Sequence, residues 1–318
     1  MKTKHFIGID IGGTKILAGL VNEKGEILNH EKTATPCDAT AKDIVYLIND
    51  LIDDVLYPTK IKLKNISGIG LGVPGLVSLS GKIIRTPNMC LSGFNLVKEL
   101  KKRLKMKIVI GNDVNMGLMG EHWLGGARNY NNVLSLFVGT GLGAAAIVEN
   151  RLLLGANGVA CEIGHMIVGN DGVLCSCGNK GCLEAYVGRW AIEKAIKKEI
   201  LTGRHSIVTS MIDQHHKVIK SKILAKGLEK KDPVVTEVMH KAAHYLGLAA
   251  ISLRHIFDPE AIVFGGGVIE ACGKYMLPVI ENTLRKDKLF LGIRDCAILP
   301  SKLGDDAVVL GSVAAAKH

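Results

Sequence analysis

One pattern that occurs twice, 127 positions apart, constrains the fold of this chain more than any other feature. The first copy spans residues 6–28 and the second spans residues 133–154. In each copy an aliphatic run ends in a glycine turn, a second aliphatic run follows, and a polar turn leads to a third. The recurrence predicts a duplicated fold with a cleft between its halves. The alternative is that a common hairpin pattern recurs by chance in an α/β protein.

Helical patterns lie between the predicted strands. Apolar residues recur at spacings of three and four in residues 43–56, 96–104, 190–200 and 234–256. Two further aliphatic runs, residues 66–72 and 261–264, also end in glycine. Strands that alternate with helices predict an α/β architecture, and 318 residues are enough for two domains.

Composition excludes several classes of protein. Hydrophobic residues make up 47% of the chain, and no run of 18 apolar residues predicts a membrane span. The N-terminal segment reaches Asp10 before a signal-peptide core forms, and five of the eight cysteines are scattered. We therefore expect a soluble, cytoplasmic protein without a disulfide framework.

The net charge of +10 favours an anionic partner, which could be nucleic acid, anionic lipid or a phosphorylated small molecule. The lysine-rich segments 98–107 and 217–231 read as amphipathic helices with solvated basic faces. Neither segment interleaves aromatic residues as a base-stacking surface would, so we expect no nucleic-acid partner.

Three glycine loops at predicted strand ends have the composition of phosphate-binding turns. The first loop lacks the Gly-Lys-Thr order and spacing of a Walker A loop. It does not fit the Rossmann pattern either, because a strand and not a helix follows it. Glycines let backbone N–H groups approach an anion, threonine adds a hydroxyl donor, and a preceding aspartate can hold hydrated Mg²⁺. Together the loops predict a nucleotide site that comprises Asp10, Gly12, Gly13, Thr14, Lys15, Gly139, Thr140, Gly141, Gly265, Gly266 and Gly267.

Three cysteines within eight positions, Cys175, Cys177 and Cys182, predict a metal site. Structural zinc is tetrahedral, and His165 is the best candidate for a fourth ligand. A lone histidine is otherwise usually a hydrogen-bonded or exposed imidazole. A disulfide among three cysteines would leave one thiol over, so we favour a closed, structural zinc site.

Asp113 follows a predicted strand, residues 108–112, at the start of a helix. It could simply cap that helix by accepting backbone N–H groups. It could equally be a catalytic carboxylate, because α/β sheets place ligands at the carboxyl ends of their strands.

Three motifs together resemble the ROK family of bacterial sugar kinases and sugar-responsive repressors: residues 10–15, Glu162-Ile163-Gly164-His165 and residues 175–184. The resemblance runs from about residue 5 to the C-terminus. It implies a duplicated actin-like, ribonuclease H-like kinase fold with two domains around a central cleft, and ATP with Mg²⁺ as cofactors. Residues 1–117, completed by a C-terminal helix at 305–318, would form one domain, and residues 118–304 the other.

The resemblance also implies residue roles. Asp113 matches the catalytic base, and the zinc ligands become His165, Cys175, Cys177 and Cys182. The positions that match sugar contacts are Asn88, Asn112, Asp113, Glu162, His165 and Glu184. For Glu162 and Glu184 the alternative is an ordinary exposed surface charge. The family often forms dimers or pairs of dimers, so we expect a homodimer or tetramer.

The sequence departs from the common glucokinase pattern at Gly111 and Val114, and no Gly-Trp follows Pro87-Asn88. Residues 74–88 look more like the allose-kinase branch. We therefore expect a hexose kinase for glucose or allose, with N-acetylmannosamine and fructose as the next candidates. Family repressors carry a DNA-binding domain ahead of the kinase-like part, and the first strand at Phe6 leaves no room for one. A non-catalytic sugar-responsive regulator is the remaining alternative.

Overall fold

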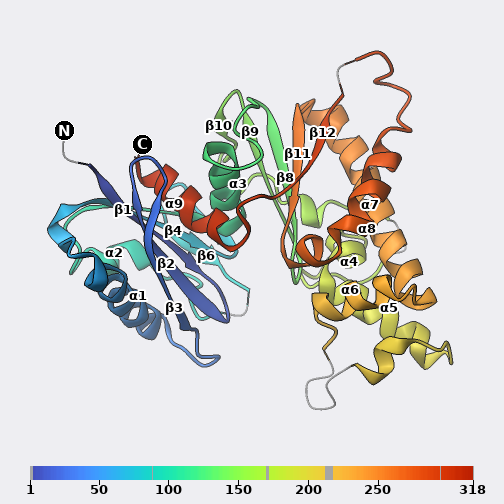
Figure 1. Cartoon of the computed structure of the whole chain (residues 1–318), viewed down its shortest axis with the longest axis horizontal. Coiled ribbons are helices and arrows are strands. Elements are labelled where there is room, and N and C mark those ends of the chain that lie inside the picture. Colours follow the sequence, from blue (N-terminus) through green and yellow to red (C-terminus); the bar gives the residue numbers. More distant parts are fainter. Residues whose placement is uncertain (1–2, 88, 170–171, 212–217, 294, 318) are drawn as a thin grey trace. The chain divides into compact units, whose positions relative to one another are not determined.

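The computed structural model describes residues 3–87, 89–169, 172–211, 218–293 and 295–317. The chain divides into two compact units, coloured along the sequence in Figure 1. The first comprises Met1–Asn129, Ala145–Cys161 and Lys302–His318, and the second comprises Tyr130–Ala144 and Glu162–Ser301. The boundary after Gly117 that the sequence predicts falls inside a helix, Asp113–Trp123, and stays a prediction.

The first sheet has the strand order β3-β2-β1-β4-β7. Strands β1, β2 and β3 are antiparallel neighbours, whereas β4 and β7 run parallel to β1. The central strands are nearly continuous apolar runs, as expected of strands covered on both faces, and β3 alternates in burial because it lies at the edge. The strands are β1 (His5–Ile11), β2 (Lys15–Asn22), β3 (Ile27–Ala34), β4 (Ile66–Val73) and β7 (Lys107–Asn112).

The second sheet repeats this order as β10-β9-β8-β11-β12. Its strands are β8 (Val133–Val138), β9 (Leu142–Val148), β10 (Arg151–Leu152), β11 (Ala261–Gly265) and β12 (Ala297–Pro300). As in the first sheet, the strand that opens the repeat is central, a hairpin lies on one side of it and parallel strands lie on the other. The duplication that the sequence predicts is therefore confirmed.

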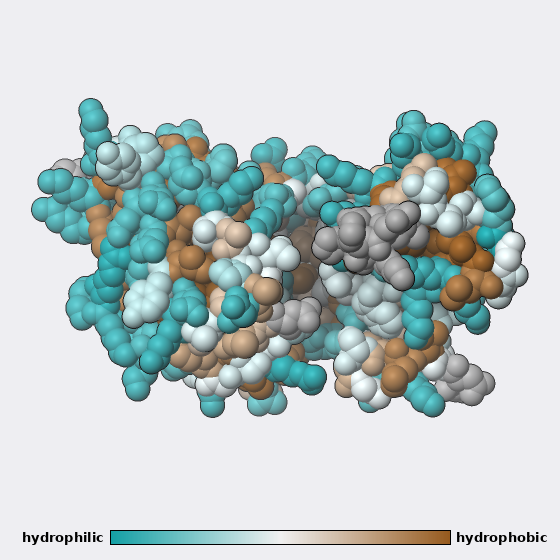
Figure 2. Space-filling view, turned by 90° about the horizontal axis from the view of Figure 1, so that it is seen from below, coloured by the Kyte–Doolittle hydropathy of each residue, from teal (hydrophilic) through white to brown (hydrophobic). Residues whose placement is uncertain are grey.

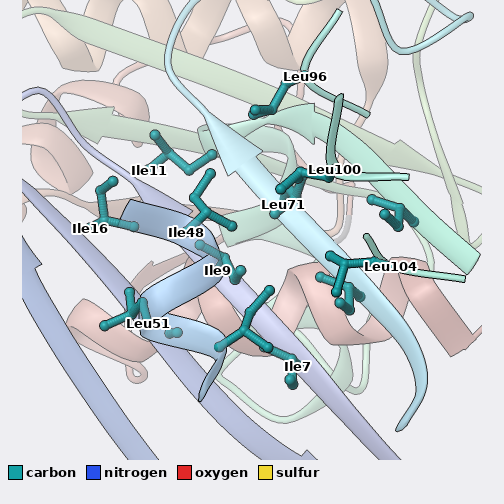
Figure 3. Packing of buried hydrophobic residues seen from close by; sticks show 14 of the residues in the cluster. Ile7, Ile9, Ile11, Ile16, Ile48, Leu51, Leu71, Leu96, Leu100 and Leu104 are labelled. Atoms are coloured by element: carbon teal, nitrogen blue, oxygen red, sulfur yellow. The ribbon is translucent and has the colours of Figure 1, made fainter. Parts of the chain in front are cut away.

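Helix α1 (Ala41–Leu56) covers one face of the first sheet. It begins with a capping box, in which Thr40 accepts from the backbone of Asp43 and Asp43 accepts from the backbone of Thr40. Figure 3 shows Ile48 and Leu51 from this helix packed against Ile7, Ile9 and Leu71 of β1 and β4. The short α2 (Leu96–Leu100) adds Leu96 and Leu100 to the same core, and the helix predicted for 96–104 ends early in a turn.

The C-terminal helix α9 (Ala307–Lys317) packs against β1, β4 and α3 (Asp113–Trp123) of the same unit, as Figure 1 shows. Strand glycines create the room for it. A Cβ on Gly8 would lie 2.1 Å from the carbonyl oxygen of Val309, and one on Gly70 would lie 1.9 Å from that of Ser312. Several strand glycines thus serve helix packing and not ligand binding.

In the second unit, the long α7 (Pro233–Phe257) packs against α8 (Gly267–Leu284). Helix α7 begins where Asp232 caps the N–H of Val235 and Pro233 occupies the first turn. The other elements of the chain are α4 (Glu184–Val187), α5 (Arg189–Leu201), α6 (Ser221–Glu229), β5 (Leu76–Val77), β6 (Ile83–Arg85), and 3₁₀ turns at Tyr57–Thr59, Leu63–Asn65, Ile163–His165, Ile207–Ser210 and Gly304–Asp306. The helices predicted for 190–200 and 234–256 are confirmed.

Across the described part of the chain, no helix combines the length and the apolar character that a membrane crossing requires. The face shown in Figure 2 is covered mainly by hydrophilic residues, with hydrophobic residues in separate groups.

Candidate active site

Three parallel strands of the first unit bring candidate site residues to one edge of their sheet. Asp10 of β1 pairs in register with Gly72 of β4, and Gly72 pairs with Gly111 of β7. Asn112 and Asp113 follow directly at the end of β7. The structure therefore places Asp10, Asn112 and Asp113 along the carboxyl edge, where α/β sheets bind ligands.

Asn112 caps helix α3. Its Oδ1 accepts hydrogen bonds from the backbone N–H groups of Val114 (2.8 Å) and Asn115 (3.0 Å), and its Nδ2 donates to the carbonyl of Gly75 (3.0 Å). Asp113 accepts hydrogen bonds from its immediate neighbourhood: the N–H of Val114 donates to Oδ1 at 2.9 Å, and its own backbone N–H and the side chain of Asn112 also hydrogen-bond to the carboxylate. The N-cap of α3 is thus Asn112, while the carboxylate of Asp113, the first residue of the helix, lies at the sheet edge.

Both aspartates at this edge are poorly stabilised as anions. Burial, and then repulsion from Asp113, raise the pKa of Asp10 from 3.8 to about 7. Burial also raises the pKa of Asp113, against the opposing effect of the Val114 N–H. A divalent cation would reverse the repulsion, and oxygen-only carboxylate donors suit Mg²⁺. The residues present therefore fit a magnesium ion held through Asp10.

The glycine turn between β1 and β2 is tight and partly exposed. The N–H of Gly12 donates to the carbonyl of Lys15 at 2.9 Å, and the hydroxyl of Thr35 donates to the carbonyl of Gly12 at 2.8 Å. Gly13 and Thr14 at the tip are exposed, as an anion site requires. Lys15 lies at the base of the turn, where its Nζ is 2.7 Å from Oδ2 of Asp305. The sequence did not indicate this ion pair, because the two residues are far apart along the chain.

Two glycine loops of the second unit lie side by side. Strands β8 and β11 are parallel, with Phe137 opposite Gly265, so the loops 139–141 and 265–267 leave the same sheet edge. Gly266 has a φ of 81°, and a Cβ there would lie 2.7 Å from the carbonyl oxygen of Val138. Helix α8 begins at Gly267, and its free N–H groups and dipole favour an anion beside the neighbouring loop.

Arg189 is a candidate site residue that the sequence reading missed. Its Nη2 donates to Oγ1 of Thr140 at 3.0 Å, and its backbone N–H donates to the carbonyl of Gly139 at 3.1 Å. The signal for it is positional: Arg189 is the first residue of α5, shortly after the cysteine motif. It places a permanent positive charge on a loop predicted to bind phosphate.

The predicted zinc ligands come together. The donor atoms of His165, Cys175, Cys177 and Cys182 all lie within 4.8 Å of one another. Sγ of Cys175 is 3.7 Å from Nδ1 of His165, and Sγ of Cys177 is 3.7 Å from Sγ of Cys182. Bonds of about 2.3 Å from zinc to sulfur give a tetrahedron with edges of about 3.8 Å. The cluster therefore matches a four-coordinate zinc site in donor type and spacing.

Glu184 is buried, which excludes the exposed surface charge considered for it. Its Oε1 accepts from the hydroxyl of Ser176 at 3.0 Å, and its Oε2 accepts from the N–H of Leu142 at 2.9 Å. The carboxylate therefore connects the cysteine loop to the residue that follows Gly141. Glu162 directly precedes the 3₁₀ turn that carries His165, and Asn88 lies outside the described residues.

Comparison with known proteins finds relatives along nearly the whole chain. The model of the ROK family matches residues 6–318. A glucokinase of Halalkalibacterium halodurans is 30% identical over 98% of this chain and 94% of its own length. A xylose repressor of Caldicellulosiruptor bescii is 30% identical over 97% of this chain and 77% of its own length. A crystal structure of a ROK family glucokinase from Streptomyces griseus, in complex with glucose and AMPPNP, matches with a TM-score of 0.83 at 31% identity, over 98% of this chain and 99% of that one. The duplicated α/β architecture is therefore the sugar-kinase fold that the resemblance implied.

Proposed function

The chain belongs to the ROK family, and from that premise we propose that it is an ATP-dependent kinase that phosphorylates the 6-hydroxyl of a hexose, either glucose or allose. The observation that carries the proposal is the arrangement at the end of β7. Asn112 satisfies the helix N-terminus, so Asp113 offers a half-buried carboxylate at the sheet edge that also carries Asp10. The glucokinases among the relatives support the reaction class.

Asp113 acts as the base in this proposal. Phosphoryl transfer proceeds through a loose transition state, in which a carboxylate orients the attacking hydroxyl and takes its proton late. The raised pKa of Asp113 strengthens its basicity relative to an exposed aspartate. Asp10 would hold Mg²⁺, which when bound neutralises charge on the transferred phosphoryl group.

Backbone N–H groups of the glycine loops would bind the phosphates of ATP. In the first unit these belong to the turn Gly12-Gly13-Thr14, with Lys15 at its base. In the second unit, the loops 139–141 and 265–267 and the start of α8 supply donors, and Arg189 adds a guanidinium group. The N–H groups of Gly12 and Gly139 already donate to the carbonyls of Lys15 and Gly141, so the phosphate donors would be other N–H groups of these turns.

The sugar contacts are assigned to Asn88, Asn112, Glu162, His165 and Glu184. With Nδ1 of His165 directed at Cys175, its Nε2 is the nitrogen left for a sugar hydroxyl. The zinc would be structural, because four protein ligands close its coordination sphere. Its part in the site is to hold His165 and the loop that bears Glu184 in fixed positions.

A turnover panel tests the proposal. ADP release is measured in a coupled assay with glucose, allose, mannose, fructose and N-acetylmannosamine, the last two representing the next candidate substrates. We expect turnover with glucose or allose, and Asp113→Asn should lower kcat by about 10²–10⁴-fold while it leaves most of the sugar affinity. The exposed Asp38→Asn serves as the matched control and should behave like the wild type.

Failure of all five sugars would contradict the kinase assignment and favour the second candidate, a non-catalytic sugar-responsive regulator. The xylose repressor relative is the observation behind that candidate. A regulator would bind a sugar and be stabilised by it against heat without consuming ATP. We further propose that the protein is cytoplasmic and that it forms a homodimer or tetramer. Light scattering of the purified protein measures the oligomeric state.

A further inference from the structure

Glu121 is a completely buried carboxylate in helix α3 that the proposed mechanism does not use. Its Oε1 accepts from the backbone N–H groups of Lys302 (2.8 Å) and Leu303 (2.9 Å), and its Oε2 accepts from the N–H of Gly126 (2.8 Å). Burying a carboxylate is costly unless hydrogen bonds compensate it. Here backbone donors from two separate segments, both in the first unit, converge on one side chain.

The segment that Glu121 holds leads directly to a turn whose Asp305 contacts Lys15, at the base of the predicted phosphate turn. Lys302 and Leu303 precede the 3₁₀ turn Gly304–Asp306, and Leu303 is its N-terminal flanking residue. Asp305 in that turn pairs with Lys15 at 2.7 Å. The pair is partly exposed, so by itself it would fix Lys15 only weakly. Anchoring the backbone two residues before Asp305 restricts where the partner of Lys15 can lie.

The opposite end of α3 carries Asp113. Glu121 lies eight positions after Asp113 in this helix, a rise of about 12 Å along a rigid spacer. Gly125 allows Glu121 to reach its partners, because a Cβ on Gly125 would lie 2.1 Å from Oε2 of Glu121. One helix thus bears the proposed base at its start and, at its end, the anchor of the segment that engages Lys15.

We propose that Glu121 is a positioning residue for the nucleotide site. It fixes the 302–303 backbone, which places Asp305, which in turn orients Lys15 beside the turn Gly12-Gly13-Thr14. The assignment rests on the proposed function, since it takes that turn to bind the phosphates of ATP.

A double-mutant cycle tests this chain of contacts. Glu121→Gln keeps the size of the side chain, but only one of its two terminal groups, the amide oxygen, can accept hydrogen bonds. One of the two segments that Glu121 anchors is therefore released. We expect the KM for ATP to rise roughly 3- to 10-fold, which corresponds to part of the free energy of a hydrogen bond to a charged group. The kcat and the KM for the sugar should change less than about twofold. Asp305→Asn should raise the ATP KM to a similar extent. In the Asp305→Asn background, Glu121→Gln should add less than about a further twofold change.

Additive effects of the two substitutions, or equal changes in kcat and in the sugar KM, would overturn the assignment. Asp305 is exposed, so if Glu121→Gln does not fold, an unchanged ATP KM in Asp305→Asn alone refutes the proposal. Asp306→Asn, in the same turn, is the matched control.

Calorimetric titration with Mg²⁺ and AMPPNP separates this inference from the kinase assignment. If no sugar supports turnover but the wild type binds the nucleotide, the variants still test Glu121 through the nucleotide Kd. A wild-type protein that binds no nucleotide would refute both the kinase and the positioning role.

Discussion

Asp10 makes the stability of the ligand-free protein depend on pH. Its folded pKa of about 7 lies above the ordinary value of 3.8, so between these values the folded chain holds a proton that the unfolded chain has released. Stability from this group is therefore complete below about pH 4 and is lost as the pH rises through 7. We expect Asp10→Asn to stabilise the protein by roughly 1–3 kcal/mol at about pH 8 and by clearly less at about pH 5, where only part of this stability has been lost.

Urea denaturation in Mg²⁺-free buffer at the two pH values measures this difference. Asp38→Asn, an exposed aspartate of the same unit, is the control and should change stability at neither pH. Saturating Mg²⁺ should stabilise the wild type more than Asp10→Asn, because the cation compensates the buried charge. Equal pH dependence in wild type and Asp10→Asn would show that Asp10 is not the titrating group.

At the level of single residues, the sequence could name the candidate side chains but could not divide their roles. The segment Asn112-Asp113 offers two residues that both cap helices well. Only the backbone geometry decides that Asn112 accepts the two N–H groups of the first turn. Long-range partners such as Asp305 of Lys15 leave no local signal in a sequence, since the fold alone brings them together.

The cysteine loop is an element whose structure should depend on the zinc ion proposed for it. Cys175 and Cys182 are buried, and burial raises the pKa of Cys182 to about 12 in the absence of a cation. A bound zinc ion would replace that cost with three thiolate bonds and fix the loop. We expect about one zinc per chain in freshly purified protein, and its loss together with a lower Tm in Cys177→Ser.

Elemental analysis and thermal unfolding of the same samples check this prediction. The exposed Cys37→Ser should keep both the zinc and the Tm, which separates ligand loss from a general effect of replacing cysteine. Wild-type protein without zinc would contradict the structural site.

Helix α9 and the sheet beneath it predict an unusually strict requirement for glycine. In β4, a Cβ on Gly70 would lie 1.9 Å from the carbonyl oxygen of Ser312, whereas one on Gly68 would lie 3.4 Å from the nearest atom, in Ala316. The backbone of a packed helix cannot move away from the added methyl group without disturbing the packing around it. Gly70→Ala should therefore destabilise the protein by about 3 kcal/mol or more. Gly68→Ala on the same strand should cost less than about 1 kcal/mol, and chemical denaturation of the two variants measures the difference.

The glycines also show why the packing of a helix against a sheet is hard to predict from the sequence. Gly12 and Gly70 both end or interrupt aliphatic runs, so both fit the pattern of a ligand turn. The repeat predicted the duplicated fold correctly, because each copy is a local hairpin pattern that the sequence shows directly. Which glycines face a helix depends on where residues 307–317 fold back, and that is a long-range contact.

For the molecule as a whole, the charge of +10 is the excess of 40 lysines and arginines over 30 aspartates and glutamates. In residues 96–107, Leu96, Leu100 and Leu104 are buried while the lysines between them point outward, as the sequence predicts. Some of this charge is already neutralised, since Lys102 pairs with Glu99 and Arg103 pairs with Asp53.

Such a distribution predicts only weak, salt-sensitive attraction to DNA. We expect a Kd for duplex DNA no tighter than about 10⁻⁶ M at physiological salt, with a steep loss of binding between about 50 and 200 mM salt. Fluorescence anisotropy with a duplex of random sequence, with and without glucose, measures it, and Lys101→Glu is the matched variant, expected to weaken binding without affecting sugar turnover. Salt-resistant binding that glucose switches on or off would contradict this reading of the charge and support the regulator candidate, because a specific interface does not depend on counterion release alone.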